Sequence, residues 1–517
     1  MAKAVLEDTD QRLNCDALVG KYMLDVVTAG MYNEPLMILR EYIQNAADSI
    51  DIAVDNGTSL LPNSYIKVAI DGQSRKLIVE DNGSGLSNSE AATILLSLGN
   101  SPKCAGKLRG FRGIGRLGGI GYCDEVKYET RSLSSEFVAE ITWNCRALKN
   151  IISDHSMIYQ LDRLIEDNVA IRLRRPKPAE LPHFFKVTMD GVHRFHQDEL
   201  MNLKRIRSYL SQVAPVDYDS SRFHFADNVR RHLSDVDGYR CYNISVNGER
   251  ILRPYVSSFQ ISRNALDEIR DIDLVEFKNP DGHSIGSGWY AKTAYLASIP
   301  KDLNIRGIRV RQGNIEVGNE YFLENIYSER RFASWHIGEV HLNSMIRPNA
   351  RRDGFEFTND YEKFLEQANA LGRHLSHLCR ASSRKRSNNL LTERILATIR
   401  KALDTPFYFD EDHHNRTLKR VTLLLGQIRA KGLEPVDPLQ LELKRIERRL
   451  SNSRTRPALL RDCLDGRTLR SLDKKSLITQ ICRAIAEMKG NGASSEDVLA
   501  LAIMPYLKSS RKCGKKP

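Results

Sequence analysis

The sequence predicts an α+β protein whose last quarter is all helical, and three observations support this prediction. Near the start of the chain, a helix pattern over residues 39–50 is followed by a short apolar strand pattern at 77–79. Residues 220–380 alternate strand and helix patterns. Beyond residue 388, nearly every apolar pattern has helical spacing. Mixed elements followed by helices alone indicate α+β domains and a separate helical module.

The first helix pattern carries three polar residues on one face. In LREYIQNAADSI, Glu41, Asn45 and Asp48 are spaced i, i+4 and i+7, which places them within about 60° of one another around a helix. The positions that flank them are apolar. Such a polar face is either a stripe exposed to water or a ligand site, and the two segments that follow favour a ligand site.

The second segment is a strand that ends in a glycine-containing turn. Residues 77–79 are apolar, and the chain continues as DNGSG at 81–85. Gly83 and Gly85 permit a turn with positive φ or a close approach of the backbone to a ligand. The carboxylate of Asp81 is able to accept a hydrogen bond from an exocyclic amine.

The third segment is dense in glycine. A run of this kind presents several backbone N–H groups to a phosphate, especially where it opens a helix. It is not a Walker A loop, because GxxxxGK[ST] does not occur in the sequence. Seven glycines lie within sixteen residues, namely Gly106, Gly110, Gly113, Gly115, Gly118, Gly119 and Gly121.

Together, and in this order, the three segments resemble the GHKL ATPase superfamily, whose nucleotide fold combines an E-x-x-x-N-x-x-D helix, D-x-G-x-G, a lid and G-x-x-G-x-G. Within it, the sequence is most similar to the 90-kilodalton heat-shock chaperones. LREYIQNAADSID resembles their nucleotide-binding helix, and SLGNSPK at 97–103 resembles the start of their ATP lid. The similarity is strong over about residues 15–135 and reappears near 340–356. It implies a GHKL (Bergerat) ATPase α/β sandwich at 15–215 and a β-α-β transducer-type middle domain at 220–380.

The resemblance implies a role for each matching residue on the helix and the strand. Glu41 would be the general base that activates the attacking water. Asn45 would bind Mg²⁺ through its side-chain carbonyl oxygen. Asp81 would accept a hydrogen bond from the adenine amino group of ATP, and Asp48 would support the sugar or the water network around the base.

Glycines and one lysine would complete the nucleotide site. Gly85 would allow the base to approach, and Gly83 of the same D-x-G-x-G motif is a further nucleotide-binding candidate. Lys103, in the lid, would reach a phosphate. The backbone amides that would cradle the phosphates belong to Gly110, Gly113 and Gly115.

One departure from the family pattern concerns adenine. The family carries a Gly-Thr strand late in the ATPase domain, and its Thr hydroxyl helps to fix the Asp and the adenine. The counterpart here is HFFKVTM at 183–189, in which Thr188 is displaced from the expected position. The sequence therefore supports Asp81 as an adenine contact but leaves the contact from the side of Thr188 open.

A second candidate patch lies in HLNSMIRPNARRDGFE. In the chaperones, the domain after the ATPase carries a loop that reads Asn, two residues, Arg and acidic, and its Arg reaches the γ-phosphate. Residues 349–353 match this loop and indicate Arg352, which would stabilise transition-state charge once the domains have closed. Arg351 is an alternative. A basic surface cluster made by Arg347, Arg351 and Arg352 would also explain the pattern.

The composition is that of a soluble protein with several domains. The chain has 517 residues, of which 41% are hydrophobic and 27% are charged, and its length predicts three to four domains. It contains no run of eighteen uncharged apolar residues and no secretory signal at the N-terminus, so we expect no membrane contact. None of the nine cysteines forms CxxC, which favours a reducing, cytoplasmic location without a disulfide framework or a zinc site.

Positive charge is concentrated towards the end of the chain. The net charge is +12, and residues 381–517 contain 29 Lys and Arg against 15 Asp and Glu, so the first 380 residues are close to neutral. A basic helical module is typical of contact with nucleic acid or with an acidic partner. A soluble helix surface rich in Arg and Lys has the same composition.

Four further segments complete the expected organisation. Residues 1–14 are polar and are expected to be mobile, or to exchange with a second subunit. Residues 381–388, ASSRKRSN, are expected to form a basic linker. Helical patterns then predict a C-terminal domain at 389–507, and the basic tail at 508–517 is expected to be disordered.

Two functions are consistent with these features. The favoured function is an ATPase: a clamp that binds and hydrolyses Mg-ATP, similar to the chaperones, in which ATP closes a lid, couples the N-terminal and middle domains and assembles a homodimer around a protein client. The alternative is a GHKL clamp that acts on nucleic acid through residues 381–517, like the members active in DNA repair, chromatin or genome defence. A histidine kinase is disfavoured, because no phospho-accepting helical pair precedes the nucleotide domain.

Overall fold

The structure, a computed structural model, describes most of the first 430 residues. The chain divides into two compact units, 1–379 and 380–517, and each is described by itself. The described residues are 2–5, 12–15, 19–28, 30, 34–97, 109, 113, 115–156, 158–403, 411–430, 444–446, 448, 479 and 502.

An eight-stranded mixed sheet forms the centre of the N-terminal domain. Its strand order is β10-β9-β3-β4-β8-β5-β6-β7, and every neighbouring pair is antiparallel except β3 with β9. Buried and exposed residues alternate along β3, as expected for a strand with one face on the core. The strands are β3 (Tyr65–Asp71), β4 (Lys76–Asp81), β5 (Glu125–Arg131), β6 (Val138–Asn144), β7 (Val169–Arg174), β8 (Phe184–Asp190), β9 (Asn243–Val246) and β10 (Glu249–Arg250).

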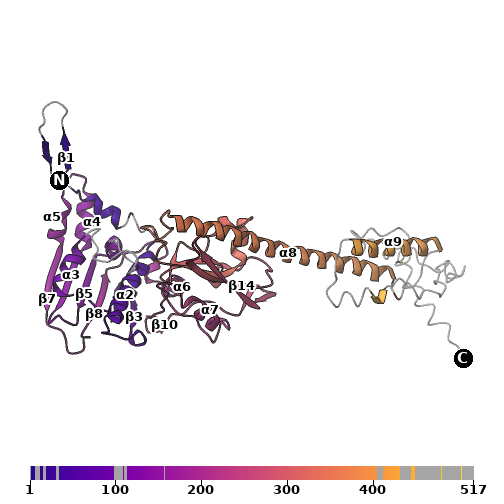
Figure 1. The fold of residues 1–517 in the computed structure, drawn as a ribbon, viewed down its shortest axis with the longest axis horizontal. Helices are drawn as coiled ribbons and strands as arrows, with labels where there is room; N and C mark the ends of the chain where they lie inside the picture. Colours follow the sequence, from indigo (N-terminus) through magenta and orange to yellow (C-terminus); the bar gives the residue numbers. More distant parts are fainter. Residues whose placement is uncertain are drawn as a thin grey trace. The chain divides into compact units, whose positions relative to one another are not determined.

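Helices pack against this sheet and build the main core with it (Figure 1). Helix α2 contributes Ile38, Leu39, Ile43 and Ile50, all fully buried. It confirms the helix predicted over 39–50, just as β4 confirms the strand predicted at 77–79. The helices of this domain are α1 (Tyr22–Val27), α2 (Met37–Asp55), α3 (Asn88–Leu96), the 3₁₀ helix η2 (Gly115–Gly121), α4 (Cys145–Ser153), α5 (Leu161–Asn168) and α6 (Leu203–Val213).

The middle domain is built on a five-stranded sheet with a hydrophobic cluster on each face. Trp289 of β14 belongs to one cluster and its neighbour Tyr290 to the other, because successive strand residues point to opposite faces. The sheet order is β13-β14-β17-β15-β16, with only β15 and β17 parallel. The elements are α7 (Ala226–Leu233), the ribbon of β11 (Ser258–Ser262) and β12 (Ala265–Glu268), and the sheet strands β13 (Asp271–Lys278), β14 (Ser284–Lys292), β15 (Gly307–Gln312), β16 (Ile315–Val317) and β17 (Ile337–Leu342).

The expected boundary between these two domains is partly wrong. The hairpin around Asn247 and Gly248 exists, with φ of 49° and 81° at its turn. It does not belong to the middle domain, however, because Ile244 of β9 pairs with Ile66 of β3 in the N-terminal sheet. The chain therefore enters the middle domain after Val216 and returns to complete the first sheet. Local alternation reveals a strand but not the distant strand with which it pairs.

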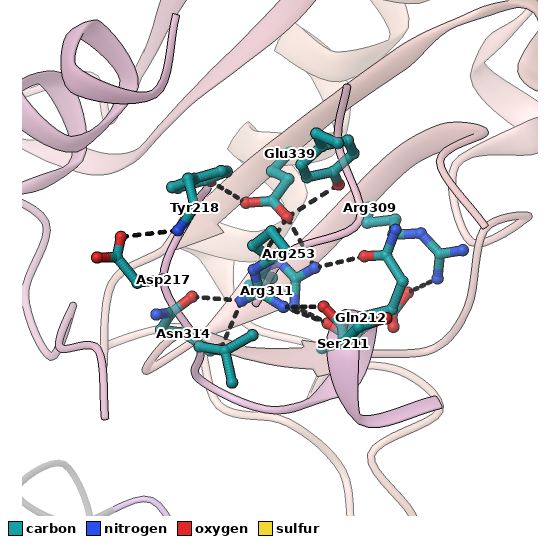
Figure 2. Close-up of polar contacts among 12 residues, drawn as sticks. Ser211, Gln212, Asp217, Tyr218, Arg253, Arg309, Arg311, Asn314 and Glu339 are labelled. Carbon is teal, nitrogen blue, oxygen red and sulfur yellow. Dashed lines mark hydrogen bonds and ion pairs between the residues drawn. The ribbon is translucent and has the colours of Figure 1, made fainter. Parts of the chain in front are cut away.

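A buried charge cluster joins the end of α6 to the middle domain (Figure 2). Glu339, Arg311 and Arg253 have no exposed side-chain surface. Arg311 Nη2 lies 2.7 Å from Glu339 Oε1, and both arginines donate to the backbone carbonyl of Gln212 in the last turn of α6. The carbonyl end of a helix carries partial negative charge. Arg311 and Arg253 compensate this charge at the end of α6, and both also lie beside the carboxylate of Glu339. Burial opposes ionisation of Glu339, but Arg311 and Arg253 hold the pKa of this carboxyl well below its ordinary value.

The prediction that residues 381–388 form a basic linker between helices is also wrong. These residues continue α8, a helix of 45 residues over Asn359–Leu403. Arg and Lys are good helix formers, so ASSRKRSN does not interrupt the helix that precedes it. Beyond it, α9 (Glu411–Ala430) packs on α8 through Ile399, Val421 and Ile428 among other residues, which confirms the helical prediction for the described part of 389–507.

Two other expectations concern the ends of the chain. Within residues 1–14, strand β1 (Ala2–Val5) pairs antiparallel with β2 (Arg12–Cys15), while the mobility of this segment stays a prediction. The basic tail at 508–517 lies outside the described residues. None of the helices in the described part of the chain is both long enough and apolar enough to cross a lipid bilayer.

Candidate nucleotide site

A pocket lies between α2, β4, β8 and the end of the glycine-dense run. Its volume is about 110 Å³. Asn45 of α2, Asp81 at the end of β4 and Gly85 all line it, so the structure brings together three of the predicted site residues. Most of the wall is apolar or aromatic, as in typical small-molecule sites. The lining residues are Tyr42, Asn45, Ser49, Ile52, Val79, Asp81, Ser84, Gly85, Leu86, Ile94, Leu95, Arg116, Tyr128, Phe185 and Val187.

The polar face of α2 is buried, which rules out a stripe exposed to water. Glu41 is 8% exposed and Asp48 is fully buried, whereas Asn45 is half-buried at the pocket wall. Buried carboxylates require partners. Glu41 pairs with its neighbour Arg40, whose Nε lies 3.4 Å from Glu41 Oε1, and Asp48 accepts a hydrogen bond from the backbone N–H of Arg109 at 3.1 Å.

The glycine-dense run approaches α2 so closely that larger residues would not fit. A Cβ atom at Gly115 would lie 2.5 Å from Oε2 of Glu41, and one at Gly119 would lie 2.2 Å from the hydroxyl of Tyr42. Gly113 has a φ of 68°, a backbone conformation that favours glycine. This run therefore limits the positions open to the carboxylate of Glu41. That role is separate from any contact of the run with phosphate. Gly110 and Lys103 lie outside the described residues.

The turn after β4 is fixed by close packing. Asp81 is buried, and its Oδ1 accepts a hydrogen bond from the N–H of Gly83 at 2.9 Å. A Cβ atom at Gly83 would lie 2.3 Å from Oγ of Ser49 on α2. Gly85 has a φ of 61°, and a Cβ there would lie 2.0 Å from the carbonyl oxygen of Arg131. Close packing alone therefore requires glycine at both positions, whether or not a base also approaches them.

The strand opposite Asp81 lacks the threonine contact of the family pattern. Phe185 of β8 pairs with Asp81 in the sheet register, and Thr188 pairs with Ile78, three residues away. Phe185 and Val187 line the pocket, and Thr188 does not. Because residues two apart share a face, Thr188 lies on the other side of the sheet. The displacement read from the sequence is therefore present in the fold.

The side chain of Arg352 reaches this region from the middle domain, whereas Arg351 contacts α2 through its backbone carbonyl, which accepts a hydrogen bond from Nη2 of Arg40 at 2.8 Å. Arg352 is 5% exposed, and its Nη2 donates to the backbone carbonyl of Arg109 at 2.6 Å. Arg351 is exposed, and its Nη2 donates to the carbonyl of Gly30 at 3.0 Å. Within the part of the chain that the structure describes, Nη1 of Arg352 is buried and has no hydrogen-bond partner.

The charge of Arg352 is poorly compensated. Burial, together with the nearby charges of Arg40 and Arg109, lowers the pKa of Arg352 to about 10, although Glu41 and Asp48 act in the opposite direction. None of these carboxylates lies within ion-pair distance of the Arg352 guanidinium among the described residues. An anion bound beside Nη1 would supply the missing charge and the missing acceptor.

Arg109, which lies immediately before GFRGIG, is a further residue of this region that no sequence motif indicates. It is the only residue described between 97 and 113, and it is buried. Its guanidinium forms ion pairs with Asp51 at 2.6 Å and with Asp48 at 3.4 Å. One arginine in a glycine-rich run gave no signal of its own, because its partners come from distant parts of the chain.

The side chains present fit magnesium-ATP. The pocket offers Asp81 for a base, and Arg352, whose pKa is influenced by the charge of Glu41, has one buried guanidinium nitrogen without a hydrogen-bond partner among the described residues. No group of three or more His, Cys, Asp or Glu suited to a metal ion occurs among the described residues. A magnesium ion at Asn45 would therefore take its other ligands from phosphate and water, as Mg²⁺ commonly does.

A family comparison agrees with this geometry. Residues 35–168 match the family described as "Histidine kinase-, DNA gyrase B-, and HSP90-like ATPase". This range contains α2, β4, the pocket turn and the glycine-dense run. Together with the mixed sheet and its covering helices, the match defines the N-terminal domain as a GHKL-type ATPase domain.

Individual relatives narrow the similarity to the 90-kilodalton chaperones. The chain is 30% identical to the chaperone protein HtpG of Bacillus velezensis over 132 residues, covering 22% of this chain and 21% of the relative. It is 28% identical to HtpG of Paraburkholderia xenovorans over 141 residues, covering 24% and 22%. It is 21% identical to the mitochondrial TNF receptor-associated protein 1 homolog of Dictyostelium discoideum over 264 residues, covering 49% and 32%. The chain thus spans about a fifth to a third of the length of these relatives.

Proposed function

We propose that this protein hydrolyses magnesium-ATP at the α2 pocket and uses the nucleotide to couple its N-terminal and middle domains. One observation carries the proposal. Arg352, a middle-domain residue, is buried near Glu41 and Asp48 of the E-x-x-x-N-x-x-D face, and one of its guanidinium nitrogens has no hydrogen-bond partner among the described residues. An arginine supplied by a second domain is a means of stabilising charge on a transferring phosphoryl group.

Each residue has a proposed task in this reaction. Glu41 would accept the proton of the attacking water, and the glycine run limits where its carboxylate can point. Asp81 would hold the adenine amino group at the pocket wall. Asn45 would hold Mg²⁺, which when bound neutralises charge on the phosphates. Arg352 would donate its free N–H to a γ-phosphate oxygen and stabilise the charge that develops there.

The proposed biological action is that of a clamp on a protein client. Two of the similar proteins are named as the chaperone protein HtpG, and a third is named as a TNF receptor-associated protein 1 homolog. By analogy, ATP would close a lid, secure Arg352 and favour a homodimer, in the cytoplasm as the cysteine usage suggests.

The test is ATP turnover combined with a size measurement. We expect turnover that depends on Mg²⁺, and a larger or more compact species in sedimentation velocity with a non-hydrolysable ATP analogue. Turnover without any analogue-dependent change would support the ATPase but contradict the clamp. Absence of both, in folded protein, would overturn the proposal.

One observation favours the alternative, a clamp on nucleic acid. Between Glu366 and Glu393, helix α8 contains five arginines and lysines and no acidic residue, and Arg384 and Lys385 are exposed. A positive helix of this kind suits a phosphate backbone. Stimulation of ATP turnover by DNA or RNA, lost as salt is raised, would favour this function over the protein clamp.

A further inference from the structure

The side chain of Arg109 connects the nucleotide helix to the middle domain. Its Nη1 lies 2.6 Å from Oδ2 of Asp51 and 3.4 Å from Oδ1 of Asp48, both on α2. Its Nε donates to the backbone carbonyl of Gly313, between β15 and β16, at 2.8 Å. Its Nη2 donates to the hydroxyl of Tyr242 at 2.9 Å. One planar guanidinium therefore meets both domains, which a single ammonium group could not do in the same geometry.

The backbone of Arg109 is used as well. Its N–H donates to Oδ1 of Asp48 at 3.1 Å, and its carbonyl accepts the hydrogen bond from Nη2 of Arg352 at 2.6 Å. The position of Arg109 therefore decides where one nitrogen of Arg352 is held. The other nitrogen, Nη1, is the one left for a ligand.

The hairpin of β15 and β16 supports both arginines. Gly313 and Asn314 form its turn with φ of 59° and 60°, and a Cβ atom at Gly313 would lie 2.9 Å from Nε of Arg109. At the other end of β16, the N–H of Gly318 donates to the carbonyl of Arg352 at 2.8 Å. Arg352 itself has a φ of 54°, an unusual conformation for this residue type that its surroundings must maintain.

The two arginines differ in how their charges are compensated. Arg109 faces two carboxylates, and Asp51 is further bound by Arg240 and by the hydroxyl of Tyr242. Burial alone would lower the pKa of Arg109, but Tyr242, Asp48 and Asp51 raise it. Arg352 has no carboxylate partner of this kind among the described residues. The protein thus supplies carboxylate partners for the charge of Arg109, whereas Arg352 could still accept an anionic ligand as its partner.

We propose that Arg109 is a positioning residue that orients Arg352 for ATP hydrolysis by tying α2 to the β15–β16 hairpin. The inference rests on the proposed ATPase function and deepens it. Arg109 does not contact the reacting atoms in this account. Because Arg109 contacts both α2 and Arg352, a shift of α2 would also shift the guanidinium of Arg352.

The test substitutes Arg109→Lys and separates binding from turnover. Lysine retains a charge for Asp51 but cannot also donate to Gly313 and Tyr242 in the same geometry. We expect the turnover number to fall about tenfold or more, with the dissociation constant for magnesium-ATP changed less than about threefold. Arg75→Lys is the matched control, because Arg75 forms a bidentate pair with Asp198 in the same domain, outside the site. Its turnover should equal that of the wild type.

A double substitution decides whether Arg109 acts through Arg352. In Arg352→Lys, turnover is already reduced, so adding Arg109→Lys should lower it by less than about twofold more. The inference would be overturned if the loss of turnover in the double variant equalled the product of the two single losses. Equal losses of affinity and turnover in Arg109→Lys would also overturn it. If Arg109→Lys does not fold by circular dichroism, Asp51→Asn tests the same link with the same expected outcomes. Absence of turnover in folded wild-type protein would instead overturn the proposed function, and the inference with it.

Discussion

Gly115 lies so close to Glu41 that a Cβ atom at position 115 would be 2.5 Å from the carboxylate oxygen Oε2. The two residues are held on η2 and α2, which pack against each other. The glycine-dense run therefore does more than offer N–H groups to a phosphate. It forms a wall that limits the orientations open to the proposed general base.

Gly115→Ala should impair turnover more than binding. The added methyl group would displace the end of the Glu41 side chain, which is flexible enough to move without disrupting the fold. Because small misplacements of catalytic groups are costly, we expect turnover to fall by about tenfold or more and magnesium-ATP affinity to change by less than about threefold. Gly72→Ala is the control, since a Cβ there meets no atom within 4 Å. Equal turnover in the two variants would contradict this account of Glu41.

Gly85→Ala should destabilise the N-terminal domain. The new Cβ would lie 2.0 Å from a backbone carbonyl oxygen and would also have to adopt a φ of 61°. Gly57→Ala separates these two effects, because Gly57 has a φ of 69° but no atom within 4 Å of its Cβ. In urea unfolding we expect a loss of about 1 kcal/mol for Gly57→Ala and about 3 kcal/mol or more for Gly85→Ala. Similar losses would show that the close contact is unimportant.

Arg352→Met should stabilise the protein while abolishing most of its turnover. The pKa of Arg352 is lowered to about 10 by burial, so the unfolded chain binds its proton more tightly and the charged group costs stability at every pH below about 10. Removing that charge should raise the free energy of unfolding by about 1–3 kcal/mol without nucleotide. Turnover should fall by about a hundredfold or more.

Arg75→Met provides the contrast for this stability measurement. The ion pair with Asp198 raises the pKa of Arg75, so its loss should leave stability unchanged or slightly lower. If Arg352→Met lowers stability as much as Arg75→Met does, Arg352 is not an uncompensated cation.

Stability should decline between pH 6.5 and pH 4 because of a buried histidine in the middle domain. Burial lowers the pKa of His341 to about 4, although its hydrogen bond to Glu339 acts in the opposite direction. The unfolded chain therefore binds the proton first as the pH falls, which costs about 2 kcal/mol at pH 5. We expect His341→Gln to lose about 2 kcal/mol less than the wild type when urea unfolding is compared at pH 7.5 and pH 5. If His341→Gln loses as much stability between pH 7.5 and pH 5 as the wild type does, groups other than His341 cause the loss.

The sequence predicted what depends on local spacing. The i, i+4, i+7 pattern placed Glu41, Asn45 and Asp48 on one helix, and the fold buries that face beside the pocket. The apolar strand before Asp81 is β4, and the displacement of Thr188 is visible in the register of β8. The roles of these residues in binding and hydrolysis stay predictions.

The sequence could not reveal relationships that depend on distant pairing. Strand β9 alternates like any half-buried strand, and only its parallel partner β3 assigns it to the first domain. Arg109 and Gly313 are separated by 204 positions, so neither residue signals the other. The polarity of residues 381–388 predicts a linker, although these residues have adequate helix propensity and continue α8.

Calorimetric titration with magnesium-ATP tests the central claim most directly, when wild type, Glu41→Ala and Asp81→Asn are compared under the same conditions. We predict that wild type and Glu41→Ala bind with dissociation constants within about threefold of each other, because the role proposed for Glu41 is to activate the attacking water and not to bind the nucleotide. Asp81→Asn should bind at least about tenfold more weakly, because Asp81 lines the pocket and is the proposed acceptor for the base. No heat from folded wild-type protein, or unchanged affinity in Asp81→Asn, would contradict the assignment of this pocket to ATP.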